Sequence, residues 1–436
     1  MANSTLNVLT GRISNGEARV GILGLGYVGL PLAVEFGAAG LSVTGFDISE
    51  SKVAGLNKGE SYIQDVESKR LKELVDQGKV KATTDFSQIS ECDALIICVP
   101  TPLSKTKDPD LSMVVSAARK IADHMRSGQL VVLESTTYPG TTDELILPML
   151  QEKGLKVGVD FFLAFSPERV DPGNVKYQTH NTPKVIGGVT PACCDAAKLL
   201  YEKAVEKVIV VSSPRAAEMV KLLENTFRSV NIGLVNEVAL MCRRLGVNVW
   251  EVIDAAATKP FGFMAFYPGP GLGGHCIPID PLYLSWKLKT LNYRARFIEL
   301  ASEINAGMPE YVVERLAEAL NDRERSLRGS RVHILGAAYK KDIEDVRESP
   351  AVDFIKILQS KGAKVTYTDS WVPTLEHEGI DLKSIDAVPA VDTADAVVII
   401  TDHSNVPYAD LVKRSKLVLD ARNATRGIEA ANLVRL

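Results

Sequence analysis

One loop combines a single cysteine with closely spaced glycines and a nearby aspartate. From Gly269 the chain reads Gly-Pro-Gly-Leu-Gly-Gly-His-Cys-Ile-Pro-Ile-Asp-Pro, so Cys276 precedes Asp280 by four residues. Glycine lets backbone come close to a ligand and adopt positive φ, at an entropic cost that a purely structural loop would rarely accept four times. A thiolate is a nucleophile, and the loop therefore predicts covalent chemistry at Cys276.

A second glycine motif lies near the N-terminus. Gly24-Leu25-Gly26-Tyr27-Val28-Gly29 follows an apolar run at 19–23 and precedes a helical pattern at 31–39. A further apolar run, 41–46, ends at Asp47. Strand, glycine turn, helix, strand and acid is the order that a dinucleotide-binding fingerprint requires. Read together, the two glycine motifs predict an oxidoreductase that also uses a covalent thiol.

Each residue type in this fingerprint has a physical task. Gly24 permits the tight turn, Gly26 admits the pyrophosphate, and Gly29 allows the helix to lie against the strand. The N-terminus of that helix presents its partial positive charge to the phosphates. Asp47 is placed to accept hydrogen bonds from a ribose diol and repels a 2′-phosphate, which favours NAD over NADP. Lys52 moderates that preference without reversing it.

The elements that hold these residues form an α/β fold. Apolar runs at 94–99, 130–133 and 161–165 alternate with helical stretches, which predicts a buried parallel sheet of the Rossmann type. Polar turns at 100–102 and 134–137 follow two of these strands. Ligands bind at the carboxyl ends of such strands.

A long helix is expected to follow the first sheet. Ser213-Pro214 combines an N-cap serine with proline at the first helical position, and Leu245-Gly246 offers a stop. The span is about 32 residues, or about 48 Å, and a helix of that length bridges domains or supports a dimer. Lys221 and Asn225 share one face of it. On spacing alone, a solvated polar face is the favoured explanation of that pair.

A third unit begins near residue 330. Apolar runs at 331–336, 364–369, 396–401 and 417–420 predict a second, smaller α/β sheet, without a full glycine fingerprint. It either holds a nucleotide by other contacts or is structural.

Composition excludes several classes of protein. The 436 residues are too many for one core, and 46% hydrophobic with 24% charged residues is ordinary for a soluble protein. A net charge of −4 gives no excess of basic residues for binding nucleic acid or an anionic membrane. No apolar run reaches the ~18 residues that span a bilayer, and residues 1–17 lack the apolar core of a secretory signal. Six cysteines without metal-ligand or disulfide spacing favour a reducing cytoplasm and no metal site.

The motifs taken together resemble those of the UDP-glucose/UDP-N-acetylhexosamine 6-dehydrogenase family. The resemblance covers nearly the whole chain, with the motifs in order. The tract 266–281 and the run Ser-Pro-Glu-Arg-Val-Asp-Pro-Gly at 166–173 are most similar to the N-acetylhexosamine branch, and nearest to UDP-GlcNAc dehydrogenases. The resemblance implies an extension at 1–17, an NAD-binding domain at 18–212, a central helical dimerisation domain at 213–315 and a UDP-binding domain at 316–436.

The family's chemistry is the oxidation of the C6 alcohol of a UDP-sugar to the acid, by two hydride transfers to NAD, for surface polysaccharide synthesis. The resemblance makes Cys276 the nucleophile that holds the aldehyde as a thiohemiacetal and then a thioester. Lys221 stabilises the oxyanions with Asn225 as its partner, and Glu168 is the base, acting through water or in thioester hydrolysis. Thr136 supports the catalytic water.

Two residues near Cys276, Asp280 and His275, also have a structural explanation. Asp280 matches an aspartate that orients water, but aspartate before proline is equally a helix cap. His275 adjoins the cysteine in sequence and is expected to be structural.

The resemblance extends to both binding sites. The expected cofactor contacts are Gly24, Gly26, Tyr27, Val28, Gly29, Asp47, Lys52, Val99, Pro100, Thr101, Ser135, Thr136 and Arg347. The expected substrate contacts are Glu168, Arg169, Val170, Lys221, Asn225, Tyr267, Gly269, Lys340 and Arg422.

This chain departs from the family pattern at three places. The stretch 259–263 lacks an arginine that in several UDP-glucose enzymes reaches the partner subunit's substrate, a contact left to Lys259 or Arg169. Ile279 and Pro172 replace a lysine and an acidic residue. These changes favour a bulkier C2 group over plain UDP-glucose. They leave the gluco, galacto and manno epimers open, so UDP-ManNAc and UDP-GalNAc remain alternatives to UDP-GlcNAc.

Two other classes of protein share part of the pattern. A two-electron β-hydroxyacid dehydrogenase also combines a Rossmann domain, a long helix and a Lys-Asn pair, but the Cys276 loop and the third domain count against it. A non-catalytic NAD-binding redox regulator would leave Lys221, Asn225 and Glu168 without a role.

Overall fold

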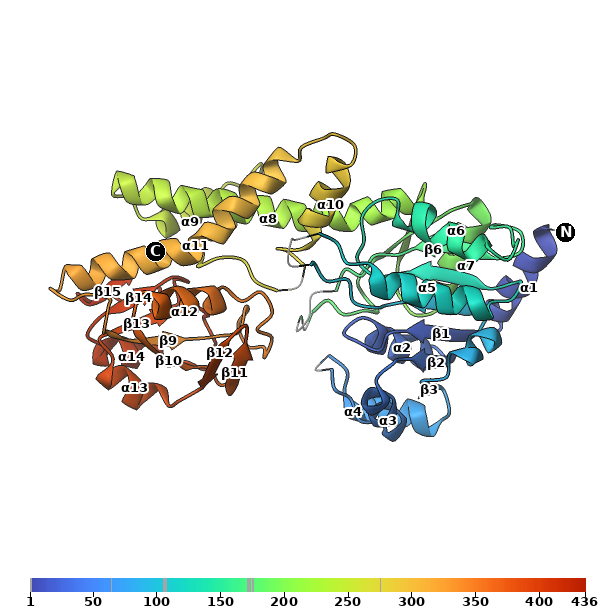
Figure 1. The fold of residues 1–436 in the computed structure, drawn as a ribbon, viewed down its shortest axis with the longest axis horizontal. Coiled ribbons are helices and arrows are strands. Elements are labelled where there is room, and N and C mark those ends of the chain that lie inside the picture. Colours follow the sequence, from blue (N-terminus) through green and yellow to red (C-terminus); the bar gives the residue numbers. More distant parts are fainter. Residues whose placement is uncertain (1, 64, 105–107, 171–173, 175, 275) are drawn as a thin grey trace. The chain divides into compact units, whose positions relative to one another are not determined.

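The computed structural model describes residues 2–63, 65–104, 108–170, 174, 176–274 and 276–436. This part of the chain divides into two compact units, residues 1–224 with 286–292, and residues 225–285 with 293–436. Figure 1 follows the chain from its blue N-terminus to its red C-terminus. Two helices continue across the division, α8 (Pro214–Leu245) and α10 (Asp280–Lys289).

The first unit is built on one sheet, whose order over the described residues is β3-β2-β1-β4-β5-β6-β7-β8. Neighbouring strands are parallel except β6 and β7. The strands are β1 (Arg19–Leu23), β2 (Ser42–Phe46), β3 (Val80–Thr83), β4 (Ala94–Ile97), β5 (Leu130–Leu133), β6 (Phe162–Phe165), β7 (Lys184–Gly188) and β8 (Val208–Val211). Every apolar run predicted as a strand in this region forms one.

Helices cover both faces of this sheet because the central strands are apolar on both sides. Ile96 packs in one core cluster, and its neighbours Leu95 and Ile97 pack in the other. The first cluster takes in α1 (Ala2–Ser14), α2 (Gly29–Ala38), α3 (Glu50–Lys58), α4 (Ser68–Asp76) and α7 (Pro191–Tyr201). The second takes in η1 (Phe86–Glu91), α5 (Ser112–His124), η2 (Thr141–Ile146) and α6 (Leu147–Gln151).

The N-terminal segment is part of this unit rather than an appendage to it. Helix α1 packs against α7, and Leu9 and Ile13 are 2% and 0% exposed. Arg12 pairs with buried Asp93 at 2.9 Å. The polar composition of residues 1–17 concealed two core positions four residues apart, which place their side chains on one helical face.

The second unit combines helices with a smaller parallel sheet of order β10-β9-β13-β14-β15 over the described residues. Its helices are α9 (Val249–Ala257), α11 (Arg296–Asn321), α12 (Pro350–Ser360), α13 (Ala387–Thr393) and α14 (Tyr408–Arg414). Its strands are β9 (Arg331–Leu335), β10 (Lys364–Thr368), β13 (Ala396–Ile399), β14 (Val418–Asp420) and β15 (Leu433–Arg435), with a hairpin of β11 (Thr374–His377) and β12 (Ile380–Lys383).

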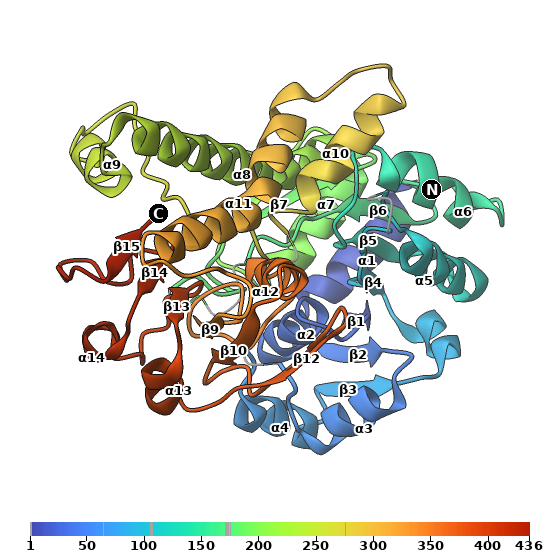
Figure 2. The ribbon, with the colours of Figure 1, turned by 60° about the vertical axis from the view of Figure 1, so that its left-hand side comes forward.

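This second sheet is also covered on both faces. Helices α11 and α12 pack on one side, while α13 and α14 lie next to each other on the other side (Figure 2). The predicted border between 315 and 316 falls inside α11, whose residues Val312 and Leu316 pack in the core of the C-terminal sheet. The predicted long helix is confirmed as α8, with 32 residues between Pro214 and Leu245.

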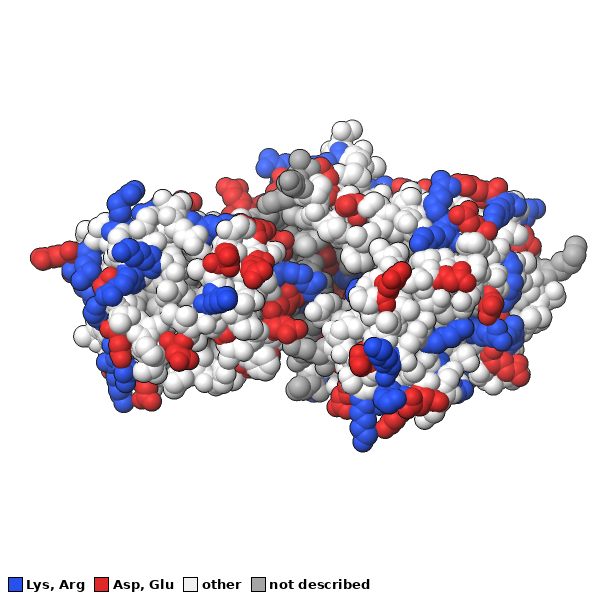
Figure 3. All heavy atoms as spheres, turned by 60° about the horizontal axis from the view of Figure 1, so that its bottom comes forward, with Lys and Arg blue, Asp and Glu red and all other residues white. Residues whose placement is uncertain are grey.

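The surface carries both signs of charge. Figure 3 shows Lys and Arg side chains interspersed with Asp and Glu over the face that is drawn. Within the described residues, no helix is both long and apolar enough to cross a membrane.

Candidate functional site

The glycine turn of the first unit leaves open space at its middle glycine. Gly24 has φ +94°, and its N–H donates to the Phe46 carbonyl at 2.8 Å. A Cβ on Gly29 would overlap the Gly24 carbonyl oxygen, so this glycine lets the start of α2 pack on the turn. A Cβ on Gly26 would meet no atom of the described residues within 4 Å. Since none of these residues crowds the position, Gly26 fits the close approach of a pyrophosphate.

Asp47 follows β2 and holds this turn. Its Oδ2 accepts a hydrogen bond from Leu25 N and its Oδ1 accepts one from Ser49 N, both at 2.9 Å. The carboxylate is 8% exposed, with Lys52 Nζ 3.8 Å from Oδ2. Each oxygen retains acceptor capacity, so the group fits a ribose diol.

The other predicted cofactor residues of this unit follow the same edge of the sheet. Val99, Pro100 and Thr101 come after β4, and Ser135 and Thr136 come after the adjacent β5. The Ser135 hydroxyl donates to the Val99 carbonyl at 2.7 Å, which ties the two loops together. Tyr27, within the glycine motif, is exposed, and Val28 is the residue before α2.

Helix α8 is fastened to the loop after β5 by two side chains. Lys221 is 8% exposed, and its Nζ donates to Thr136 Oγ1 at 2.5 Å. One turn earlier, Glu218 accepts hydrogen bonds from Gly140 N at 2.6 Å and from Thr142 N at 2.9 Å. Burial raises the pKa of Glu218 to about 7, although these hydrogen bonds oppose the shift. The structure therefore brings Lys221 and Thr136 together.

Glu168 lies in a polar cluster that the sequence did not reveal. Its Oε1 accepts from Arg169 N and Val170 N, each at 2.7 Å, and its Oε2 accepts from Lys184 Nζ at 3.0 Å. Lys184 also contacts Glu134. Burial raises the pKa of Glu168, but the Lys184 charge and the hydrogen bonds outweigh it and bring the value to about 2. Glu168 is thereby held as a carboxylate.

Arg169 is turned toward the protein. Its guanidinium donates to Glu224 at 2.6 and 3.2 Å and to the Pro183 carbonyl at 2.6 Å. Of the two residues considered for the missing arginine, Lys259 is the exposed one.

Two buried hydroxyls at the same sheet edge make no hydrogen bond within the described part of the chain. They belong to Thr137, after β5, and to Ser166, after the adjacent β6. Sequence reasoning singled out neither. Both follow strands whose ends were recognised as ligand-binding positions, which is the signal that could have found them.

Cys276 lies in the turn that leads into α10. Its carbonyl accepts hydrogen bonds from Ile279 N at 3.1 Å and from Asp280 N at 2.8 Å, and its side chain is partly exposed. Helix α10 begins at Asp280, as the sequence predicted. The thiol therefore belongs to a residue one turn ahead of the first residue of α10.

Asp280 joins this turn to α8. It is 1% exposed, and its Oδ2 accepts a hydrogen bond from Asn225 Nδ2 at 2.6 Å. It occupies the first residue of α10, and this bond directs its carboxylate to α8.

The glycines of the cysteine loop have a packing reason within the second unit. A Cβ on Gly273 would lie 2.5 Å from Tyr339 Cβ, and one on Gly274 would lie 2.8 Å from the Tyr339 ring. Gly274 N donates to the Arg347 carbonyl at 3.0 Å. These two glycines therefore have a packing role against the third domain, and the approach of a ligand to the loop stays a prediction.

Residues predicted to contact the substrate cluster around the start of this loop. Gly269 N donates to Asn236 Oδ1 at 2.9 Å, and a Cβ on Gly269 would lie 2.7 Å from Arg422 Nη1. The Tyr267 hydroxyl donates to Asp254 Oδ1 at 2.9 Å. Arg422 Nε lies 3.3 Å from Asp402 Oδ1. Gly269 and Arg422 are therefore neighbours, although far apart in sequence.

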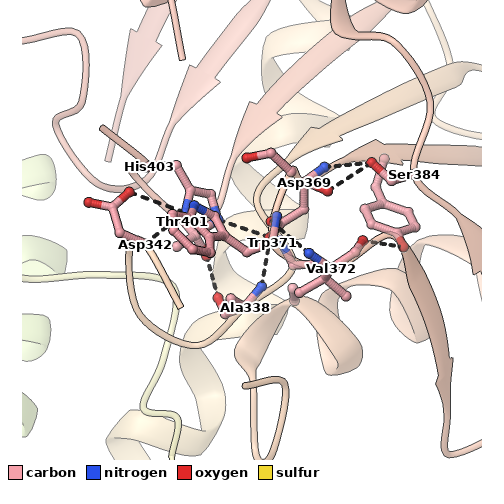
Figure 4. Close-up of polar contacts among 12 residues, drawn as sticks. Ala338, Asp342, Asp369, Trp371, Val372, Ser384, Thr401 and His403 are labelled. Atoms are coloured by element: carbon pink, nitrogen blue, oxygen red, sulfur yellow. Dashed lines mark hydrogen bonds and ion pairs between the residues drawn. The ribbon is translucent and has the colours of Figure 1, made fainter. Parts of the chain in front are cut away.

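A polar network supports the loop that carries Lys340 (Figure 4). Asp369 Oδ2 accepts from Ala337 N at 2.7 Å and Ala338 N at 3.0 Å, and lies 2.9 Å from His403 Nε2. His403 Nδ1 accepts from Asp342 N at 2.9 Å. Asp369 follows β10 as Asp47 follows β2, and like Asp47 it is buried and accepts hydrogen bonds from the protein's own turns. Arg347, at the end of this loop, bonds to Asp345.

Some predicted positions fall outside the described residues. They are His275 and the stretch 171–173, which contains Pro172.

The mostly parallel sheet with its glycine turn and acid defines a Rossmann-type NAD-binding oxidoreductase, here joined to a thiol-bearing loop and a second α/β domain. Models of the UDP-glucose/GDP-mannose dehydrogenase family match three segments of the chain: the NAD-binding domain over 18–205, the central domain over 215–307 and the UDP-binding domain over 333–427. The chain belongs to this family of NAD-dependent UDP-sugar dehydrogenases.

Relatives in the family differ in the sugar that their names give. The chain is 39% identical to UDP-N-acetyl-D-mannosamine dehydrogenase of Pyrococcus horikoshii, over 93% of this chain and 95% of the relative. It is 37% identical to UDP-N-acetyl-D-glucosamine 6-dehydrogenase of Pseudomonas aeruginosa, over 82% and 83%. It is 35% identical to NDP-N-acetyl-D-galactosaminuronic acid dehydrogenase of Ralstonia solanacearum, over 92% and 95%.

Solved structures agree in architecture. UDP-D-ManNAc dehydrogenase from Pyrococcus horikoshii superposes with a TM-score of 0.88 at 37% identity, covering 96% of this chain and 98% of that one. The UDP-N-acetyl-mannosamine dehydrogenase Cap5O from Staphylococcus aureus gives 0.83 at 32% identity, with the same coverage. The predicted three-domain α/β architecture and the NAD cofactor are confirmed. The β-hydroxyacid dehydrogenase and redox-regulator alternatives are set aside.

Proposed function

We propose that this enzyme oxidises the C6 alcohol of a UDP-N-acetylhexosamine to the carboxylic acid, with UDP-GlcNAc as the first candidate substrate. The observation that carries the proposal is the position of Cys276, one turn ahead of α10 and four residues from an aspartate bonded to Asn225. A two-electron dehydrogenase has no use for such a thiol. Relatives named for mannosamine and galactosaminuronic acid make those epimers the alternatives.

We assign Lys221 to the first oxidation. The turn of Gly24, Gly26 and Gly29, with Asp47 beside it, would hold an NAD molecule, which would supply the acceptor for the hydride that leaves C6. The Lys221 ammonium, held by Thr136, stabilises the negative charge that develops on the C6 oxygen as its proton departs. An oriented ammonium in a water-poor site lowers the activation free energy of such a step by about 3 kcal/mol.

The second oxidation is assigned to Cys276. Its sulfur bonds to C6 of the aldehyde, and the proton of the thiol is transferred to the aldehyde oxygen, which gives a thiohemiacetal. Loss of a second hydride, for which a second NAD would be the acceptor, and loss of the hydroxyl proton to water give a thioester. Water then bonds to C6, the carbon–sulfur bond breaks, and the acid and the free thiol are released. We assign Asp280, Asn225 and Glu168 to orienting the water and the oxygen atoms in these steps.

The UDP-sugar contacts are proposed on the same basis. Tyr267, Gly269, Lys340 and Arg422 come from the second unit, and the cluster of Gly269 with Arg422 supports their pairing. Glu168, Arg169 and Val170 contribute the strand-end loop of the first unit. Arg347 remains a proposed cofactor contact.

We also propose a homodimer formed through the central helices. Exposed apolar side chains recur along α8 at Phe227, Leu234, Met241 and Leu245, a spacing that forms one stripe. Phe297 on α11 is exposed as well. A continuous apolar stripe on a helix marks a protein interface. A reducing cytoplasm is the proposed location because the Cys276 chemistry needs a free thiol.

Counting NADH tests the proposal. With UDP-GlcNAc, each sugar molecule consumed is expected to yield two NADH. UDP-ManNAc, UDP-GalNAc and UDP-glucose are assayed in the same way as alternative substrates. Cys276→Ser is expected to release no acid from any of them. One NADH per sugar, or full acid formation by Cys276→Ser, would refute the covalent four-electron route.

A further inference from the structure

A buried lysine lies between two carboxylates in the first unit. Lys184 is the first residue of β7, with its side chain 3% exposed. Its ammonium contacts Glu134, which follows β5, and lies 3.0 Å from Glu168 Oε2, which follows β6. Strand order β5-β6-β7 brings the three residues together at one edge of the sheet. None of the roles assigned above uses Lys184 or Glu134.

The partners of the two carboxylates differ. Glu168 accepts from Lys184 and from two backbone N–H groups, all of which can only donate. Glu134 contacts Lys184 and the Tyr201 hydroxyl of α7, whose oxygen is 2.5 Å from Oε2. A hydroxyl can donate or accept, so a protonated Glu134 can donate to Tyr201. Only Glu134 can therefore carry a proton without losing a hydrogen bond.

Charge balance leads to the same assignment. Two ionised carboxylates with one ammonium leave a net negative charge in a buried site, which is costly. The titratable groups that face Glu134 are Lys184, Glu168, Tyr201 and Cys98. Burial raises the pKa of Glu134 to about 7, while Lys184 and the Tyr201 hydrogen bond limit the rise. The pair therefore holds one proton below neutral pH and loses it above.

We propose that Lys184 and Glu134 position and charge-tune Glu168: Lys184 fixes the Glu168 carboxylate in orientation, and Glu134 carries the exchangeable proton of the pair. When Glu134 ionises, it competes for the Lys184 ammonium and adds a second negative charge beside Glu168. Glu168 then becomes a stronger acceptor for the proton of an attacking water. The inference rests on the proposed function, since it concerns the hydrolysis of the Cys276 thioester.

The hydrolysis step offers the sharpest test. Cys276 is acylated during this step, so its own titration does not contribute. Acid release from the acyl-enzyme is measured by rapid quench on both sides of about pH 7, where Glu134 is expected to titrate. The wild-type rate is expected to rise through this range. Glu134→Gln is expected to lose that rise and keep the KM of the wild type, because it retains hydrogen-bonding groups but cannot ionise.

Lysine variants test orientation. Lys184→Met removes the ammonium and is expected to slow acid release by about 100-fold, the size of effect seen when a reacting group is misplaced by about 1 Å. Lys184→Arg keeps the charge and is expected to recover part of the rate and the pH-dependent rise. Lys198→Met is the matched control, since Lys198 lies exposed on α7 in the same unit and pairs with Glu202. It is expected to behave as wild type.

The outcomes separate this inference from the proposed function. NAD binding by each variant shows that the domain is folded, and if Lys184→Met does not fold, Glu134→Gln and Lys184→Arg still decide. A wild type that forms two NADH, together with a Glu134→Gln variant that keeps the pH-dependent rise, overturns the inference alone. Unchanged acid release in a folded Lys184→Met variant would also overturn the inference. A wild type that forms no acid from any UDP-sugar overturns the proposed function instead.

Discussion

The Asn225 amide donates to the Asp280 carboxylate at 2.6 Å, and this bond joins the long helix α8 to the first turn of α10, which follows Cys276. Asp280 is 1% exposed, so the amide contributes to stabilising a charge that is shielded from water. The bond gives the thiol-bearing turn a defined anchor on α8. Because of this bond, a substitution at Asn225 is also expected to affect Asp280.

Asn225→Ala is expected to lower both activity and stability. It removes one donor from a buried carboxylate, a change that costs about 1–3 kcal/mol. Thermal unfolding and kcat measure the two effects. Asn231→Ala is the control, because Asn231 lies on the same helix and its amide donates to the Phe227 carbonyl in an exposed hydrogen bond. Equal unfolding temperatures for the two variants would show that the Asn225–Asp280 bond does not contribute to stability.

Asp47→Asn is expected to weaken the preference for NAD over NADP. The amide removes the negative charge that repels a 2′-phosphate, and it keeps only one of the two acceptors that hold Leu25 N and Ser49 N. KM for NAD should rise and KM for NADP should fall, as measured with one fixed sugar substrate. A variant that still rejects NADP as strongly as the wild type would remove Asp47 from cofactor selection.

Gly273→Ala is expected to destabilise the second unit by about 1–3 kcal/mol, the usual cost of overpacking. The added Cβ would lie 2.5 Å from Tyr339 Cβ and 2.9 Å from the Glu348 carbonyl oxygen. Gly307→Ala in α11 is the control, since a Cβ there would meet no other atom within 4 Å in the part of the chain that the structure describes. That change should stabilise by about 0.5–1 kcal/mol, because alanine is the better helix former. Denaturant unfolding of both variants checks the contrast.

Glu218→Gln is expected to change how stability depends on pH. Burial raises the folded-state pKa of Glu218 to about 7, above its ordinary value of 4.5. Its favourable contribution is therefore fully present below about pH 4.5 and is lost as the pH rises through about 7. The wild type should lose unfolding free energy across this window relative to the variant. Parallel pH profiles for the two proteins would contradict the assignment.

The sequence by itself determined the elements that depend on local signals. A serine-proline start and a leucine-glycine stop predicted α8 at Pro214–Leu245, and apolar runs predicted most strands of both sheets, but not β3, β7, β8 or β15. These signals work because caps, turns and strand burial are read within a few residues. The dinucleotide-binding turn could be predicted for the same reason, since its three glycines follow one strand and Asp47 follows the next.

Only the tertiary structure decided the contacts between distant segments. Lys184 was not recognised because its partners Glu134 and Glu168 come from two other strands, and only the order β5-β6-β7 makes them neighbours. Leu9 and Ile13 looked like part of a polar extension until α1 packed on α7. Gly273 and Gly274 suggested ligand approach, and their closest neighbour is Tyr339. Burial, pairing and close approach depend on which segments meet, and local sequence does not encode that.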